Sequence, residues 1–159
     1  MSTGLIGSHP FTGGYVLIEP HVMSGLNRYR QREGTDPEAG GLLLGYRRAM
    51  HLHIVSYSPP FLTDRQARFS FKRRCKGHAE VAQMHWRTSH GIVDYLGEWH
   101  THPDVNASPS SIDLREWRKL LGKRDGPLVF LILGIAEDWL GVGLRSEIAR
   151  IAERPALAP

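Results

Sequence analysis

The sequence is poor in cysteine and has no long hydrophobic run. Cys75 is the single cysteine among 159 residues, which excludes internal disulfide bonds and cysteine-ligated zinc ribbons and fits a reducing cytoplasm. The longest apolar run, residues 128–136, is too short to cross a bilayer. The first ten residues contain no basic segment followed by an apolar core, so no signal peptide is expected. These absences predict a cytoplasmic protein without a membrane partner.

The composition is that of a globular protein. Hydrophobic residues make up 41% of the chain and charged residues 23%, and the length suits a single domain with a sizeable core. The net charge of +4 is compatible with an acidic partner or with solubility alone. Aromatic side chains are sparsely interleaved with the basic ones, so nucleic acid is not an expected partner.

Strand and helix patterns alternate along the chain. We expect strands at 14–19, 38–48, 51–58, 67–72, 91–102, 127–136 and 139–144, and helices at 20–32, 76–89 and 110–121. This order predicts an α/β fold with one mixed sheet and helices on both faces. Residues 1–145 form the predicted domain, and residues 146–159 are expected to be a tail that is helical and then disordered.

The stretch GEWHTHPDVNASPSSID, residues 97–113, carries the strongest chemical signal. His100 and His102 share one face of the predicted strand, which suits a metal chelate. A catalytic zinc takes three protein ligands and leaves one position open, and Asp113 is the natural third ligand. Ser110 and Asp113 would occupy the first turn of the next helix, at N-cap and N3. Ser110 could then hydrogen-bond an oxygen that gains charge.

Two alternatives compete with this interpretation. Ser110 and Asp113 also form an ordinary helix-capping signal. The residues His51, His53 and Asp64 repeat the ligand spacing, but no proline ends their strand, and a phenylalanine stands where the serine would be.

Two further residues could act in the chemistry. Glu98 shares the strand face of the two histidines, and could be a base or a hydrogen-bond partner of a ligand. Cys75 lies in the basic stretch 72–78, where positive charge could activate its thiol. No partner histidine and acid are recognisable there, so a solvated basic edge is the preferred interpretation.

The motif HTHP followed by SSID resembles the His-x-His-Pro…Ser-x-x-Asp motif of the JAMM (MPN-type) metalloproteases. The segment EAGGLLLG, beginning at Glu38, resembles the glutamate-headed apolar strand of the same enzymes. The resemblance implies a curved, three-layer, cytidine-deaminase-like fold. It also implies that His100, His102 and Asp113 bind Zn²⁺, that Glu38 is the general base, and that Ser110 stabilises the tetrahedral intermediate.

The phrase YLGEWHTHP is similar to a bacterial branch of this family, the deconjugase of the anti-phage system CBASS. The similarity implies cleavage of the bond that joins the C-terminus of a cGAS-like nucleotidyltransferase to a protein, after an activating and conjugating enzyme has made it. We expect the scissile segment to lie extended beside a sheet edge. The alternatives are a general or ubiquitin-like-pathway JAMM peptidase, a non-catalytic MPN scaffold and a DNA-repair-associated relative.

Overall fold

The computed structural model describes residues 3–61, 65–67, 70–72 and 75–155. These residues form a nine-stranded sheet in the order β10-β9-β8-β7-β3-β4-β2-β1-β11, three helices and a small β5–β6 hairpin. The strands of the large sheet are β1 (Leu5–Ser8), β2 (Tyr15–Ile18), β3 (Gly40–Arg48), β4 (His51–Tyr57), β7 (Asp94–Thr101), β8 (Leu128–Leu133), β9 (Trp139–Leu144), β10 (Glu147–Arg150) and β11 (Glu153–Pro155). The remaining elements are α1 (Pro20–Asn27), α2 (Cys75–Thr88), α3 (Ser111–Leu121), β5 (Arg65–Ala67) and β6 (Ser70–Lys72).

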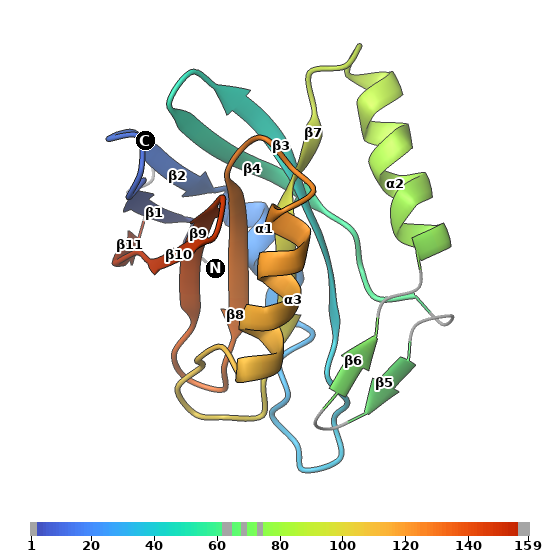
Figure 1. Ribbon diagram of the computed structural model, residues 1–159. Coiled ribbons are helices and arrows are strands. Elements are labelled where there is room, and N and C mark those ends of the chain that lie inside the picture. Colours follow the sequence, from blue (N-terminus) through green and yellow to red (C-terminus); the bar gives the residue numbers. More distant parts are fainter. Residues whose placement is uncertain (1–2, 62–64, 68–69, 73–74, 156–159) are drawn as a thin grey trace.

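The predicted mixed sheet with helices on both faces is confirmed. The pairs β2–β4 and β7–β8 are parallel, and the other pairs of the large sheet are antiparallel. On one face, α1 packs on the main hydrophobic cluster. On the other face, α2 and α3 pack on two separate clusters; Figure 1 shows α3 in front of β8 and α2 at the right, beyond β7. The result is three layers with strands buried on both sides.

Helix α1 begins where the sequence predicted and ends earlier. Pro20 occupies the first turn, where its missing N–H costs nothing. The expected helix continued to residue 32, but the structure ends it at Asn27. Beyond that point Arg30 forms an ion pair with Asp138, and Gln31 is buried in the interior. These tertiary contacts replace the last helical turn.

Strand β7 lies inside the sheet between β3 and β8 and carries the site at its end. The register with β3 shifts between Leu43 and Leu44, which leaves Leu96 as the extra residue of a β-bulge. Gly97 follows, at a φ of 157°, and a Cβ placed there would lie 1.8 Å from the carbonyl oxygen of Val129. The strand beyond this bulge is regular, so the alternation of side chains holds at the site.

The expected helix in the C-terminal segment is wrong. Residues 147–150 form β10 against β9, and residues 153–155 form β11 against β1. Ile151 between them is 4% exposed, so the segment belongs to the domain as far as it is described. The edges of β9 and β1 offer more hydrogen bonds than an isolated helical turn can form. The segment therefore forms strands instead of the expected helix. Strand β1 was also not predicted. Among the described residues, no helix is long and apolar enough to span a membrane.

Candidate metal centre

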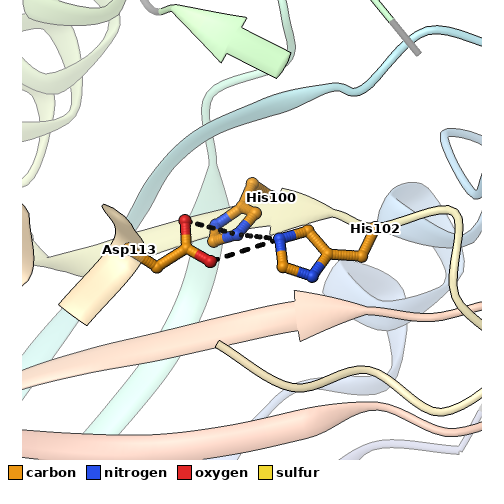
Figure 2. A group of neighbouring side chains, drawn as sticks. All are labelled: His100, His102 and Asp113. Atoms are coloured by element: carbon orange, nitrogen blue, oxygen red, sulfur yellow. Dashed lines mark hydrogen bonds and ion pairs between the residues drawn. The ribbon is translucent and has the colours of Figure 1, made fainter. Parts of the chain in front are cut away.

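The two histidines lie where β7 leaves the sheet. His100 is still paired with Gly40 on β3 and Ile132 on β8, and the His102 N–H donates to the carbonyl of Leu133 at 2.9 Å. Both imidazoles point to the α3 side of the sheet, as Figure 2 shows, while Thr101 between them is fully buried on the other side. Because side chains alternate along a strand, His100 and His102 lie on one face, as the sequence predicted.

Asp113 reaches the histidines from the first turn of α3. The Ser110 hydroxyl accepts a hydrogen bond from the Asp113 N–H at 3.1 Å, and the Asp113 carboxylate accepts one from the Ser110 N–H at 2.7 Å. This reciprocal capping box fixes the carboxylate at the helix start. The same carboxylate faces both imidazoles. Capping and metal ligation were weighed as alternatives, but the geometry allows both at once.

Three ligand atoms converge on one point. The two Nε2 atoms are 3.0 Å apart, and they lie 3.4 Å (His100) and 3.3 Å (His102) from the Asp113 oxygens. Tetrahedral zinc with bonds of about 2.0–2.1 Å separates its ligand atoms by about 3.3 Å. The spacing and the donor set therefore fit a zinc-like cation. Among the described residues, His100, His102 and Asp113 are the single group of three or more His, Cys, Asp or Glu side chains that could hold a metal ion.

The charges of these side chains are strongly coupled. Burial raises the pKa of Asp113, but hydrogen bonds from both imidazoles outweigh it and hold this pKa well below its usual range. Burial lowers the pKa of His102, and the Asp113 carboxylate more than reverses that, so the net pKa is raised. Asp113 is thus an anion at all working pH values, as a metal ligand must be.

Glu38 lies just before β3 and lines the same cleft as His100 and Asp113. The cleft has a volume of about 390 Å³. Glu38 is 8% exposed, and burial raises its pKa to about 7, although nearby His102 opposes the rise. A carboxyl with such a pKa can exchange a proton near neutral pH. Because Glu38 and the histidines are far apart in sequence, only the β3–β7 pairing brings them together.

Glu98 and Ser110 also lie next to the centre. Glu98 lines the cleft on the same strand face as His100, as predicted, and the Tyr95 hydroxyl donates to its Oε1 at 3.5 Å. Ser110 is exposed, and its oxygen is already an acceptor in the cap. Its O–H remains a donor that a bound oxygen could use.

The rival histidines have other partners. His53 Nε2 lies 2.6 Å from a Glu19 carboxylate oxygen, and His51 Nδ1 accepts the Tyr15 N–H at 3.0 Å. Asp64, which would complete that alternative site, lies outside the described residues. The side chain of Cys75 is not described either, so the hypothesis of a reactive thiol stays a prediction.

One link to the site was missed from the sequence. The Thr101 hydroxyl accepts the Ala39 N–H at 2.9 Å and donates to Gln31 Oε1 at 3.0 Å. The Gln31 amide in turn donates to the Asp36 carbonyl at 3.0 Å. Gln31, 1% exposed, thus holds the loop on both sides of Glu38. A buried glutamine just after an amphipathic helix is not a recognisable signal without the fold.

The expectation that the scissile segment lies extended beside a sheet edge stays a prediction, and β7 itself offers no free edge for it. Strand β7 has β3 on one side and β8 on the other. At the start of β3, Ser58 occupies the outer side, because its N–H donates to the Leu42 carbonyl and its hydroxyl accepts the Leu42 N–H. The cleft beside α3 lies open on the face of the sheet next to these strands.

An α/β sheet that carries a His–His–Asp group at the end of an inner strand has the arrangement expected of a metal-dependent hydrolase. A family model described as prokaryotic homologs of the JAB domain matches residues 25–143, and the chain belongs to this family. The solution structure of the protein DSY2949 from Desulfitobacterium hafniense is similar in fold, with a TM-score of 0.61 and 24% identity over 84% of this chain and 87% of that one.

Two curated relatives share much of the sequence. An Escherichia coli protein named CD-NTase/cGAS isopeptidase is 34% identical over 140 residues, covering 88% of this chain and 89% of its own length. A Pseudomonas aeruginosa protein of the same name is 41% identical over 106 residues, covering 65% of this chain and 67% of its own. These relatives and the family agree with an isopeptidase-type enzyme.

Proposed function

We propose that this chain is a zinc-dependent isopeptidase that releases a protein conjugated through its C-terminus, and that this protein is a cGAS-like nucleotidyltransferase. The observation that carries the proposal is the convergence of His100, His102 and Asp113 in a cleft that also contains Glu38. The names of the relatives support the choice of substrate.

His100, His102 and Asp113 would hold the ion at the wall of the cleft. Zinc at such a site supplies a water that ionises near neutral pH and an electrostatic partner for the scissile carbonyl. The two imidazoles are held by the sheet and the carboxylate by the capping box, so no reorganisation is needed to bind the ion. Asp104 lies 3.8 Å from His102 Nδ1, the nitrogen that does not face the other ligands.

Glu38 would take a proton from the attacking water and deliver it to the departing amine. A carboxylate beside the attacking water can take up its proton and release it to the amine, which is the task of a general base and acid. The Ser110 hydroxyl, at the N-cap of α3, would donate a hydrogen bond to the oxyanion. Glu98 would line the cleft without taking part in proton transfer.

The substrate chemistry implies a preceding reaction. A C-terminal carboxylate must be activated before it can be joined to an amine, so an activating and conjugating enzyme would supply the conjugate. The present chain would reverse that step, as part of bacterial anti-phage defence in the cytoplasm.

A fusion protein tests the proposal directly. The C-terminal tail of a cGAS-like nucleotidyltransferase is joined to a fluorescent protein, incubated with the zinc-loaded chain, and analysed by intact mass. We expect cleavage immediately after the last residue of the tail, abolished by a chelator and by Glu38→Gln. If the fusion survives while ubiquitin chains or unrelated peptides are cut, the chain is instead a general peptidase.

A further inference from the structure

A second pocket, with a volume of about 320 Å³, lies between α2 and α3 beside the cleft of the candidate metal centre. Leu120 lines both cavities, and Leu42 of the second pocket is the register partner of Glu98 in the first. The Tyr95 hydroxyl also contacts Glu98. The two adjoining cavities lie on the same sheet face, and together we call them the α2–α3 groove. Its outer part is lined by Leu42, His78, Ala79, Ala82, Gln83, Tyr95, Leu120 and Arg124.

The outer part of the groove is shaped for an apolar side chain. Leu42 and Tyr95 form its floor on the sheet. Ala79 and Ala82 line the α2 side, where their small side chains leave room. Such a surface takes apolar groups that water would otherwise cover.

The charge of the groove changes along its length. Near the metal centre it carries Glu38, Glu98 and Glu116, the last paired with Lys119 at 2.9 Å. Lys123 lines this inner cavity as well, whereas Arg124 lines the outer one. The Arg124 guanidinium lies over the Tyr95 ring, 4.5 Å from its centroid. A guanidinium held over an aromatic ring can present N–H groups to a carboxylate.

We propose that the α2–α3 groove binds the extended tail of the protein being released, with an acidic side chain beside Arg124. This inference rests on the proposed function. The other side of an isopeptide bond offers only a lysine side chain before the folded target begins, whereas the tail is a main chain that can fill a long groove. The tail thus has the right shape for the groove, and the cation at the outer end selects its charge.

The position of the acidic residue follows from the strand beneath it. Tyr95 and His100 are five residues apart on β7, which at about 3.3 Å per residue is roughly 16 Å. An extended ligand running along the same direction covers that distance in four to five residues. The acidic side chain therefore stands at about the fourth or fifth residue before the scissile bond.

Binding of labelled peptides tests the groove without requiring cleavage. The probes are fluorescein-labelled peptides of glycine and alanine whose C-terminus is joined to a lysine ε-amine. They carry either glutamate or lysine at the fourth and fifth residues before that bond. Zinc-loaded Glu38→Gln protein is titrated with each, and anisotropy reports the Kd. We expect the glutamate peptide to bind about tenfold more tightly, the effect of one charge-assisted hydrogen bond.

Charge reversal provides the matched comparison. Arg124→Glu should remove or invert the preference and keep the zinc content. Arg118→Glu makes the same charge change at an exposed α3 position that does not line either cavity, and should leave the preference intact. Ala82→Trp should fill the outer pocket and weaken binding of both peptides.

The outcomes separate this inference from the proposed function. Equal binding of the two peptides, or equal effects of Arg124→Glu and Arg118→Glu, overturns the assignment of the groove. Charge-dependent binding together with a wild-type chain that cleaves no isopeptide bond overturns the isopeptidase and leaves the groove standing as a peptide site.

Discussion

At the scale of single residues, Asp113 combines a structural and a chemical task. Its carboxylate accepts the Ser110 N–H at 2.7 Å and also faces both imidazoles. The capping box therefore fixes where the Asp113 carboxylate points, and the start of α3 forms part of the candidate metal centre. Glu38 takes no part in a helix cap, and burial in the cleft raises its pKa.

Glu38→Gln should keep its zinc and lose cleavage. Glu38 is not one of the three converging ligands, and loss of a positioned base typically lowers the rate by ~10²–10⁴. Zinc is measured by elemental analysis, and kcat/KM with the tail fusion. Glu98→Gln, a second carboxylate in the same cleft, is the control and should stay within about tenfold of wild type. A dead Glu98→Gln beside an active Glu38→Gln would assign the base to Glu98.

Glu38 also makes the stability of the metal-free protein depend on pH. Its pKa rises from 4.5 to about 7 on folding, so the folded state holds this proton more tightly than the unfolded state. The resulting stability is present below pH 4.5 and is lost as the pH rises to about 7. Chelated wild type should therefore lose on the order of 2–3 kcal/mol relative to Glu38→Gln across this window.

Urea unfolding at several pH values measures the difference. Asp113 is present in both proteins, so its own titration largely cancels in the comparison. If the two proteins show parallel stability profiles from pH 4.5 to 7, the raised pKa is wrong.

At the scale of elements, the end of β7 is fastened to the loop before β3. Thr101 bonds Ala39 through its hydroxyl and through its own N–H, and Gln31 continues the link to Asp36. These bonds hold the end of the strand that carries the two histidines against the segment that carries Glu38. A positioning role for Gln31 and Thr101 follows from these bonds.

Thr101→Val should lower kcat more than it changes KM. Valine keeps the shape of threonine but leaves the buried Ala39 N–H and the Gln31 amide oxygen without this partner, at a cost of about 1–3 kcal/mol. Glu38 would then be held less accurately, while the groove that binds the substrate is unchanged. Steady-state kinetics with the tail fusion and zinc content are measured together.

The conservative replacement distinguishes positioning from general destabilisation. Thr101→Ser retains the hydroxyl and should recover most of kcat even though it leaves a small cavity. A Thr101→Val protein with wild-type kcat would show that the link does not position the base.

At the scale of the whole molecule, the metal centre exists only in the folded chain. Its ligands come from β7 and α3, and the sheet and helix must both be in place before the three atoms converge. A ligand that binds only the folded state stabilises it by mass action. Zinc should therefore raise the Tm of the wild-type protein.

His102→Ala should lose most of its zinc and the zinc-dependent rise in Tm. His51→Ala, on the rival strand β4, should bind close to one zinc per chain as wild type does, because His51 bonds the Tyr15 N–H instead. Elemental analysis and thermal unfolding with and without zinc check both variants. A His51→Ala protein that is empty while His102→Ala stays loaded would move the metal site to β4.

The outer strands show how long-range pairing overrides local pattern. The pattern of residues 147–159 predicts a short helix. The described part of this segment instead pairs with β9 and with β1. Each strand is too short to be stable alone, and each gains its hydrogen bonds from a partner that is distant or already fixed in the sheet. No local propensity encodes such a pairing, and for that reason β1, β10 and β11 were not predicted.

The local features of the site were determined by the sequence itself. The alternation of a strand places His100 and His102 on one face, and the capping box places Asp113 three residues after Ser110. Both rules act over a few residues and need no knowledge of the rest of the chain. Only the tertiary structure decided the nearness of Glu38, the Gln31–Thr101 link and the α2–α3 groove. Each of these depends on which strands pair and which helices pack on the same face, and those choices are made by burial across the whole sheet.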